Sequence, residues 1–328
     1  WHEQANHPHW HGLRLCGIDG VVWRVQDTPE NNEAFGKASN QHGERGYPQV
    51  RMVCLMELSS HLIQGSEFDR YDVNEMRLAA RLSASASDNS ITLFDKGFYS
   101  PGLLHHWQNA GKNRHWLLPL KKNVQYDVIH KLGRQDSLVR IRTTPQAKKQ
   151  WSGLPEEITA RLVTRKIDGV ERQILTSLTD ACRYPGADVA ELYRHRWEIE
   201  LGYREAKQGL LCNRWTLRSR LPEMVRQELW GVLLTYNLVR YQMVRMAFHL
   251  KGDYLPYQLS FSSAITEMMR LLITLPWASP GTVPGELKRF YEQARHCVLP
   301  LRRERSYPRE VRAKCKKYPD RKAAGHLK

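Results

Sequence analysis

The stretch SITLFDKGFYSPGLLHHWQNAGKNRHWLLPL, residues 90–120, predicts a strand, a helix and a second strand in direct succession. Residues 90–94 form a short β-favouring run that stops at Asp95. Residues 101–109 have helical composition, and residues 115–120 return to an apolar, extended pattern. Because strands that alternate with helices are typical of mixed α/β sheets, this stretch sets the expected fold class as α/β.

Apolar runs before this stretch predict four further strands and one helix. The strands are expected at 13–18, 21–25, 50–58 and 60–65, and the helix at 74–82. The pair Asp19-Gly20 between the first two runs is a hairpin signal. The polar, Gly- and Asn-rich residues 26–47 predict a loop.

After residue 122 the pattern changes twice. Short alternating runs at 137–143, 157–167 and 170–178, with an Asp168-Gly169 turn between the last two, predict an antiparallel β unit inserted into the α/β body. From residue 188 onward the chain is expected to be mostly helical, over 188–211, 221–248 and 258–275.

Composition narrows the class of protein. The chain has 328 residues, a net charge of +16 and 41% hydrophobic residues, which excludes a wholly disordered chain. No apolar run approaches the roughly 18–20 residues that span a bilayer. Six scattered cysteines without zinc spacing are typical of reduced thiols in a cytosolic protein. The positive charge, concentrated partly in the tail 301–328, favours a polyanionic partner.

The segment ADVAELYRHRWEIELGYREAKQGLL, residues 187–211, places four polar groups on one helix face. At about 100° per residue, the side chains of Tyr193, Arg196, Glu200 and Lys207 share an arc of about 60° beside the apolar stripe. A carboxylate among phosphate-binding groups suits a site where metal and nucleic-acid backbone meet. The alternative is a surface row of ion pairs that only stabilises the helix.

Two aspartates stand at the ends of expected strands. Asp19 and Asp95 taken singly predict a turn and a helix cap. At the ends of adjacent strands, however, both carboxylates would project into one crevice of the sheet. A helical glutamate above that crevice completes a three-carboxylate site of the kind that takes Mg²⁺ or Mn²⁺.

These residues resemble a known family. Tyr193, Arg196, Glu200 and Lys207 match, in spacing, the YREK motif of bacterial insertion-sequence DDE transposases of the family numbered four. The similarity extends to GIDG around Asp19, DTPENNEAFG at 27–36, FDKGFYS around Asp95 and the helical residues 217–240. It covers the chain from about Gly12 to Arg240.

The resemblance implies a ribonuclease H-like mixed sheet with a β-rich insertion before the Glu-bearing helix and a helical C-terminal part. The expected division is 1–122 for the first part of the catalytic core, 123–181 for the insertion, 182–250 for the rest of the core, and 251–328 for a helical region with a basic tail. The family's end-recognition domain has no counterpart in the dozen residues before the first expected strand, so a truncated or excised domain is expected.

The resemblance also implies the chemistry. Asp19, Asp95 and Glu200 are expected to hold two Mg²⁺ ions, which Mn²⁺ could replace, for phosphodiester cleavage and strand transfer. Tyr193, Arg196 and Lys207 are expected to bind phosphates near the transposon end. The implied partner is double-stranded DNA, at transposon ends and target, bound by a dimer in the cytoplasm and without a membrane. Related cut-and-paste enzymes hold a flipped base on an aromatic residue of the insertion.

Further candidates for DNA contact stand in basic surroundings, each with an alternative. Trp151 could stack on a base or pack in the protein. Lys121 and Lys122 could steer a phosphate or be solvated at a strand end, and the same choice applies to Arg218 and Arg220. Two rival functions also stay open: a domesticated metal-dependent nuclease, and a DNA-binding remnant without catalysis.

Overall fold

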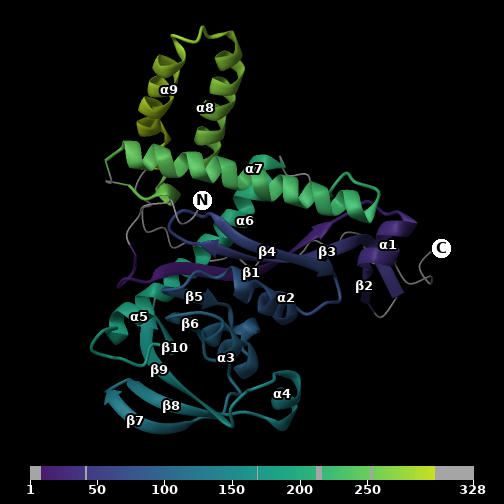
Figure 1. Cartoon of the computed structure of the whole chain (residues 1–328). Coiled ribbons are helices and arrows are strands. Elements are labelled where there is room, and N and C mark those ends of the chain that lie inside the picture. Colours follow the sequence, from purple (N-terminus) through teal and green to yellow (C-terminus); the bar gives the residue numbers. More distant parts are fainter. Residues whose placement is uncertain (1–8, 41–42, 168, 212–215, 252–253, 300–328) are drawn as a thin grey trace, which may run out of the picture. The chain divides into compact units, whose positions relative to one another are not determined.

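The structure is a computed structural model that describes residues 9–40, 43–167, 169–211, 216–251 and 254–299 (Figure 1). Its centre is one mixed sheet, which confirms the α/β class. The strands are β1 (Arg14–Arg24), β2 (Lys37–Asn40), β3 (Gly43–Glu57), β4 (Ile63–Arg70), β5 (Ser90–Phe94), β6 (Arg114–Pro119), β7 (Asp127–Gly133), β8 (Asp136–Arg142), β9 (Glu157–Ile167) and β10 (Val170–Thr176).

The strand order identifies the core of this sheet. Strands β4, β3 and β1 pair antiparallel, and β1, β5 and β6 then pair parallel, so the order across the core is β4-β3-β1-β5-β6. The parallel connections run through helices, as residues 90–120 predicted. This order is that of the ribonuclease H-like sheet which the resemblance implied.

Helices cover both faces of the sheet. Helices α2 (Glu75–Leu82) and α3 (Pro101–Asn109) pack on one face, together with alternate residues of β1 and β3 such as Ile18 and Val53. The opposite face carries α5 (Gly186–Leu192), α6 (Trp197–Arg204) and α7 (Pro222–His249), packed on Leu15, Cys54 and Leu93. The side chain at every second position of β1 and β5 therefore faces α6.

The β-rich segment extends the same sheet. Strand β10 pairs antiparallel with β6, and β9, β8 and β7 follow in order. Strands β8, β9 and β10 lie where alternation predicted them, whereas β7 and the short helix α4 (Pro145–Gln150) were not predicted. Six of the seven residues of β7 are exposed, so β7 lacks the alternation of buried and exposed residues that marks a half-buried strand. Asp168 of the predicted turn lies outside the described residues.

Two local predictions near the first strand are wrong. Strand β1 continues through Asp19-Gly20 without a hairpin, because β3 pairs with it along Cys16–Arg24. The expected loop at 26–47 contains helix α1 (Pro29–Phe35), β2 and the start of β3. Thr28 caps α1 with its hydroxyl and Pro29 opens it, which are helix-start signals that the polar composition concealed.

The C-terminal part is helical, as predicted. Helix α7 spans the expected 221–248, α8 (Phe261–Thr274) spans most of 258–275, and α9 (Val283–Glu292) is an additional helix. Within the described residues, none of the helices combines the length and apolar character needed to cross a membrane. The predicted basic tail from residue 301 lies outside the described residues.

Candidate active site

Asp19 and Asp95 occupy equivalent positions on neighbouring parallel strands. The register of β1 and β5 pairs Ile18 with Phe94, the last residue of β5, so Asp19 is the next residue of β1 and Asp95 directly follows β5. Both follow the alternation that points Leu15 and Leu93 toward the face covered by α6. The sheet therefore brings together the two carboxylates that the sequence predicted to meet.

The surroundings of the Asp19 carboxyl group disfavour its ionised form. Burial raises its pKa to about 6, and the negative charges of Glu200 and Asp95 add to that increase. The backbone N–H of Gly20, which donates to Asp19 Oδ1 at 2.8 Å, and the charge of Arg196 only partly offset it. A carboxyl group in this state gains from any cation that approaches it.

Glu200 lies on α6 and shares an ion pair with Arg196. Arg196 Nη2 is 2.8 Å from Glu200 Oε1, and the guanidinium also interacts with the charges of Asp19 and Asp95. Arg196 Nε is buried and lacks a hydrogen-bond partner among the described residues. The guanidinium thus stands among all three carboxylates with one donor still available for a ligand.

Tyr193 belongs to the same cluster. Its side chain is half-buried, and burial raises the pKa of its phenol, with Arg196 and Asp95 acting on it in opposite directions. A phenol that stays protonated is a hydrogen-bond donor to an anion. Tyr193, Arg196 and Glu200 are therefore brought together, as their helical spacing predicted.

The helix that carries these residues is not one regular α-helix. Residues Tyr193–Arg196 form a 3₁₀ turn, Trp197–Arg204 form α6, and Glu205–Leu210 form a π-helical turn. The prediction of a single 60° arc assumed a constant 100° per residue and is wrong in that respect. π-Turns occur frequently at functional sites, and this one begins five residues after Glu200 and contains Lys207.

Lys207 lies beside β1 rather than among the carboxylates. Its Nζ donates to the carbonyl of Val22 at 3.3 Å and lies 5.0 Å from the centre of the Trp23 ring. Burial lowers the pKa of this amine. Since Val22 follows Asp19 by about 10 Å along the strand, Lys207 can reach a different phosphate from Arg196.

Tyr203 is a site residue whose contact the sequence did not predict. Its hydroxyl donates to the carbonyl oxygen of Asp19 at 2.6 Å and accepts from the N–H of Cys54 at 3.2 Å. Asp19 and Cys54 are register partners of β1 and β3, so this hydroxyl fastens α6 onto the sheet at Asp19. The sequence assigned Tyr203 only to the apolar stripe, because a period of 3.6 residues carries no information about its hydroxyl.

The carboxylate oxygens of Asp19, Asp95 and Glu200 are of the chemical type that binds a divalent cation. Three carboxylates from two strands and a helix offer the hard oxygen ligands that Mg²⁺ and Mn²⁺ prefer. In the described part of the chain, no three His, Cys, Asp or Glu side chains stand close enough together to hold an ion. Glu200 is turned toward Arg196, so its carboxylate must leave that guanidinium to join Asp19 and Asp95.

The remaining basic candidates for DNA contact have exposed side chains, and they differ in how firmly hydrogen bonds fix their backbone. Lys121 and Lys122 follow β6, and Lys121 lines a groove of about 900 Å³ between Tyr99 and β8. Arg218 and Arg220 project from a backbone that is fixed at both sides. Glu228 accepts from the Arg218 N–H at 3.1 Å, and the Arg220 carbonyl accepts from the Thr28 hydroxyl at 2.8 Å.

Trp151 ends α4 and packs on α3. A Cβ placed on Gly102 would lie 2.1 Å from the Trp151 ring, so the indole rests directly on the helix backbone. The His106 ring lies 5.5 Å away, centre to centre. Trp151 is thus a packing residue in this structure, and its stacking on a DNA base stays a prediction.

Known transposases are similar to this chain over a range that contains all the site residues described above. A family model described as Transposase DDE domain matches residues 10–238. Transposase InsG for insertion sequence element IS4, from Escherichia coli K12, is 53% identical over 97% of this chain and 72% of that protein. Putative transposase InsZ of the same bacterium is 45% identical over 37% of this chain and 40% of its own length. A chain of the piggyBac transposase synaptic complex with hairpin DNA is similar at 11% identity and a TM-score of 0.41, over 90% of this chain and 59% of that chain.

Proposed function

This chain belongs to the insertion-sequence DDE transposases, and we propose that Asp19, Asp95 and Glu200 are its catalytic carboxylates. A transposase cleaves DNA and transfers the cut strands, with divalent metal as the family's cofactor. The observation that supports the assignment is the register of β1 and β5, which places two aspartates side by side under the helix that carries Glu200. Arg196 links that glutamate to both aspartates.

We propose that the three carboxylates hold two Mg²⁺ ions, with Mn²⁺ as a substitute. The chemistry that such ions supply is activation of the attacking oxygen and stabilisation of the leaving oxygen in an in-line displacement. Asp19 supports this assignment, since burial, and then the charges of Glu200 and Asp95, raise the pKa of its carboxyl group, and a bound cation would offset both effects. Tyr203 keeps the Asp19 backbone in place while the carboxyl group changes its partner.

Arg196 would change partners when DNA binds. Its guanidinium pairs with Glu200, and its buried Nε–H has no hydrogen-bond partner among the described residues. A phosphate can accept from this fork in a bidentate manner, which frees Glu200 to turn toward Asp19 and Asp95. Tyr193 would donate its hydroxyl to the same strand.

We propose double-stranded DNA, at transposon ends and target, as the partner. Lys207, Lys121, Lys122, Arg218 and Arg220 would bind backbone phosphates, and Trp151 would stack on an extruded base. Two copies of the chain would assemble on the DNA. The cytoplasm is the proposed location, since the relatives are bacterial and bacterial DNA lies there.

Incubation of the purified chain with supercoiled plasmid tests this function. With Mg²⁺ or Mn²⁺ we expect nicked and linear products, and none in a metal chelator. Asp19→Asn, Asp95→Asn and Glu200→Gln should each reduce cleavage by about 1,000-fold or more while DNA affinity is kept or rises, because negative charge is removed. Undiminished cleavage by the Glu200→Gln variant would overturn the assignment, and joining of a labelled end to the plasmid separates a transposase from a nuclease.

A further inference from the structure

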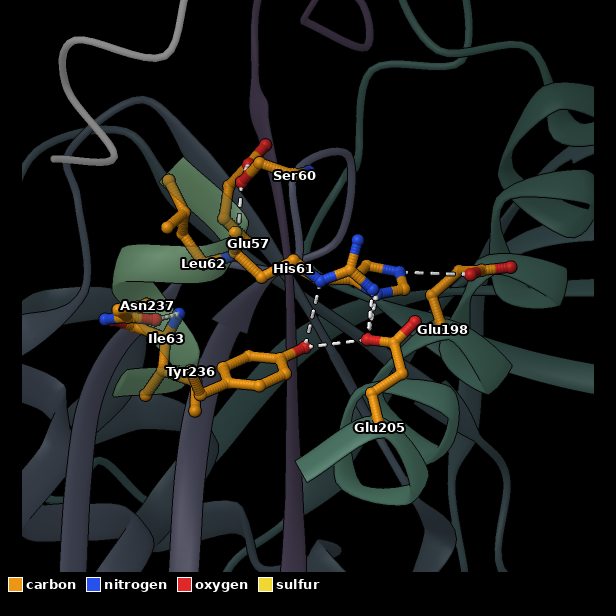
Figure 2. Close-up of polar contacts among 10 residues, drawn as sticks. Glu57, Ser60, His61, Leu62, Ile63, Glu198, Glu205, Tyr236 and Asn237 are labelled. Atoms are coloured by element: carbon orange, nitrogen blue, oxygen red, sulfur yellow. Dashed lines mark hydrogen bonds and ion pairs between the residues drawn. The ribbon is translucent and has the colours of Figure 1, made fainter. Parts of the chain in front are cut away.

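A buried polar cluster lies behind Glu200, on the opposite side of its helix. Glu198 and Glu205 come from that helix, His61 from the turn between β3 and β4, and Tyr236 from α7 (Figure 2). Arg240, also from α7, contacts His61 and Glu205. We call these five residues the Glu-helix anchor. Both glutamates lie on the helix face away from Glu200, and their partners His61, Tyr236 and Arg240 are buried.

His61 is the centre of the anchor. Its side chain is 1% exposed, its Nε2 lies 3.1 Å from Glu198 Oε2, and its Nδ1 lies 2.7 Å from Arg240 Nη2. His61 Nδ1 also lies 3.5 Å from Glu205 Oε2, so the ring contacts Arg240 and both glutamates.

Arg240 supplies the positive charge of the anchor. Its side chain is fully buried and forms an ion pair and hydrogen bond with Glu205 Oε2, to which the Tyr236 hydroxyl also donates at 3.1 Å. Burial opposes the ionisation of Glu205, but Arg240 and His61 outweigh it and lower the pKa of Glu205 to about 2. The carboxylate is thus held from two directions by α7.

The turn that carries His61 is itself fixed. His61 has a left-handed backbone, with φ of 62°, and its N–H donates to the Glu57 carbonyl at 2.8 Å. The Asn237 side chain bonds both the N–H and the carbonyl of Ile63, at 2.9 and 2.8 Å, so α7 is joined to β4 beside the turn (Figure 2). His61 and Arg240 therefore form part of a rigid unit made of the sheet and α7.

Two features of the anchor concern Glu200 directly. Glu198 and Glu205 are about two helical turns apart, on either side of Glu200, so contacts to both define the axial position and the rotation of the helix. The π-turn begins at Glu205, the residue that Arg240 holds. A hydrophobic contact is non-directional and would leave both the rotation and the start of the π-turn less well defined.

We propose that His61 and Arg240 are positioning residues for Glu200. They hold Glu198 and Glu205 so that the Glu200 carboxylate projects toward Asp19 and Asp95, and they touch neither DNA nor metal. The inference rests on the proposed function, in which Glu200 is a metal ligand.

The affinity of the DNA-free chain for Mn²⁺ alone, measured by the paramagnetic resonance of unbound Mn²⁺, tests this role without catalysis. Arg240→Gln should weaken the binding of Mn²⁺ by about 10-fold, since the helix loses its fixed rotation. The matched control is Arg161→Gln. Arg161 is equally buried, pairs with Asp136 and donates to the carbonyls of Leu178 and Tyr184, so its loss removes a buried ion pair that does not touch α6. Its Mn²⁺ affinity should stay unchanged.

A double-variant cycle separates positioning from a general loss of structure. If Arg240 acts through Glu200, adding Arg240→Gln to Glu200→Gln should change the Mn²⁺ affinity no further. Equal and additive effects of Arg240→Gln in both backgrounds, or equal effects of Arg240→Gln and Arg161→Gln, would overturn the positioning role. An unchanged affinity in Glu200→Gln alone would overturn the proposed function, and the positioning role with it.

One double variant covers the case in which Arg240→Gln does not fold. Arg240→Met combined with Glu205→Leu removes both charges together and avoids an unpaired buried charge. Its Mn²⁺ affinity should again fall by about 10-fold, because the directional contacts are lost. Wild-type affinity in this folded variant would show that packing alone positions Glu200.

Discussion

The sheet and the helix hold the three carboxylates that we propose as catalytic in different ways. Asp19 and Asp95 are fixed by backbone pairing, since the register of β1 with β5 determines that they end side by side. Glu200 is fixed by side-chain contacts of its helix. Tyr203 of that helix donates to the Asp19 carbonyl in the sheet, and Glu198 and Glu205 contact the other residues of the Glu-helix anchor. Backbone pairing tolerates substitution because any residue supplies the same N–H and C=O groups. The helix should therefore be the more sensitive half of the site.

Among variants of the helix, Gly202→Ala should have the largest effect on stability and cleavage. A Cβ at Gly202 would lie 2.5 Å from Met56 Cε and 3.0 Å from the Tyr236 hydroxyl, so either the end of the buried Met56 side chain shifts or α6 moves away from β3 and α7. We expect a loss of about 1–3 kcal/mol in stability and on the order of 100-fold in cleavage. Urea unfolding and plasmid nicking measure the two effects.

The control for this variant is Gly231→Ala on α7. An added Cβ there meets nothing within 4 Å, so the helix should gain up to about 1 kcal/mol and cleavage should not change. Equal cleavage by the two alanine variants would mean that the close approach of α6 does not position Glu200.

Arg196→Lys should lower cleavage by about 10-fold or more, although the charge is kept. Lysine lacks the planar fork and the Nε–H donor that is buried and unpaired in the described structure. Arg194→Lys is the control, because Arg194 is exposed and pairs with Glu191. Rates are compared at saturating DNA, and a loss confined to DNA affinity would argue against a role near the reacting phosphate.

Tyr203→Phe should cost about 1–2 kcal/mol in stability. The change removes the hydroxyl that joins the Asp19 carbonyl to the Cys54 N–H and adds no group in its place. The exposed Tyr47→Phe serves as reference for urea unfolding. If both variants unfold at the same urea concentration, the hydroxyl does not fasten α6 to the sheet.

Ionisation of Asp19 should make the stability of the folded chain depend on pH. Its pKa rises from 3.8 to about 6 on folding, so the folded state favours the protonated carboxyl group. The stability it contributes is complete below pH 3.8 and is lost as the pH rises through about 6. Asp19→Asn should therefore gain about 1–2 kcal/mol relative to wild type between pH 4 and pH 8, in a metal chelator. A difference in melting temperature that is constant with pH would contradict the raised pKa.

Much of this molecule was predictable from local sequence. Strands β5 and β9 and helix α3 begin and end where their patterns predicted, since each has a distinct period or composition and clear boundary residues. The predicted family is confirmed by relatives that match most of the chain. The hairpin at Asp19-Gly20 failed because a turn signal is a local preference, and pairing with β3 along the whole of β1 outweighs it.

The sequence by itself determined which residues can do chemistry: two aspartates after apolar runs and a helix bearing Tyr193, Arg196 and Glu200. Only the tertiary structure decided that Arg196 pairs with Glu200, that Lys207 turns toward β1, and that His61 and Arg240 stand behind the helix. His61 and Arg240 are separated from the helix in sequence, and no periodicity connects them to it. Their contacts arise because the sheet and α7 bury the same face of α6, where polar groups must find partners.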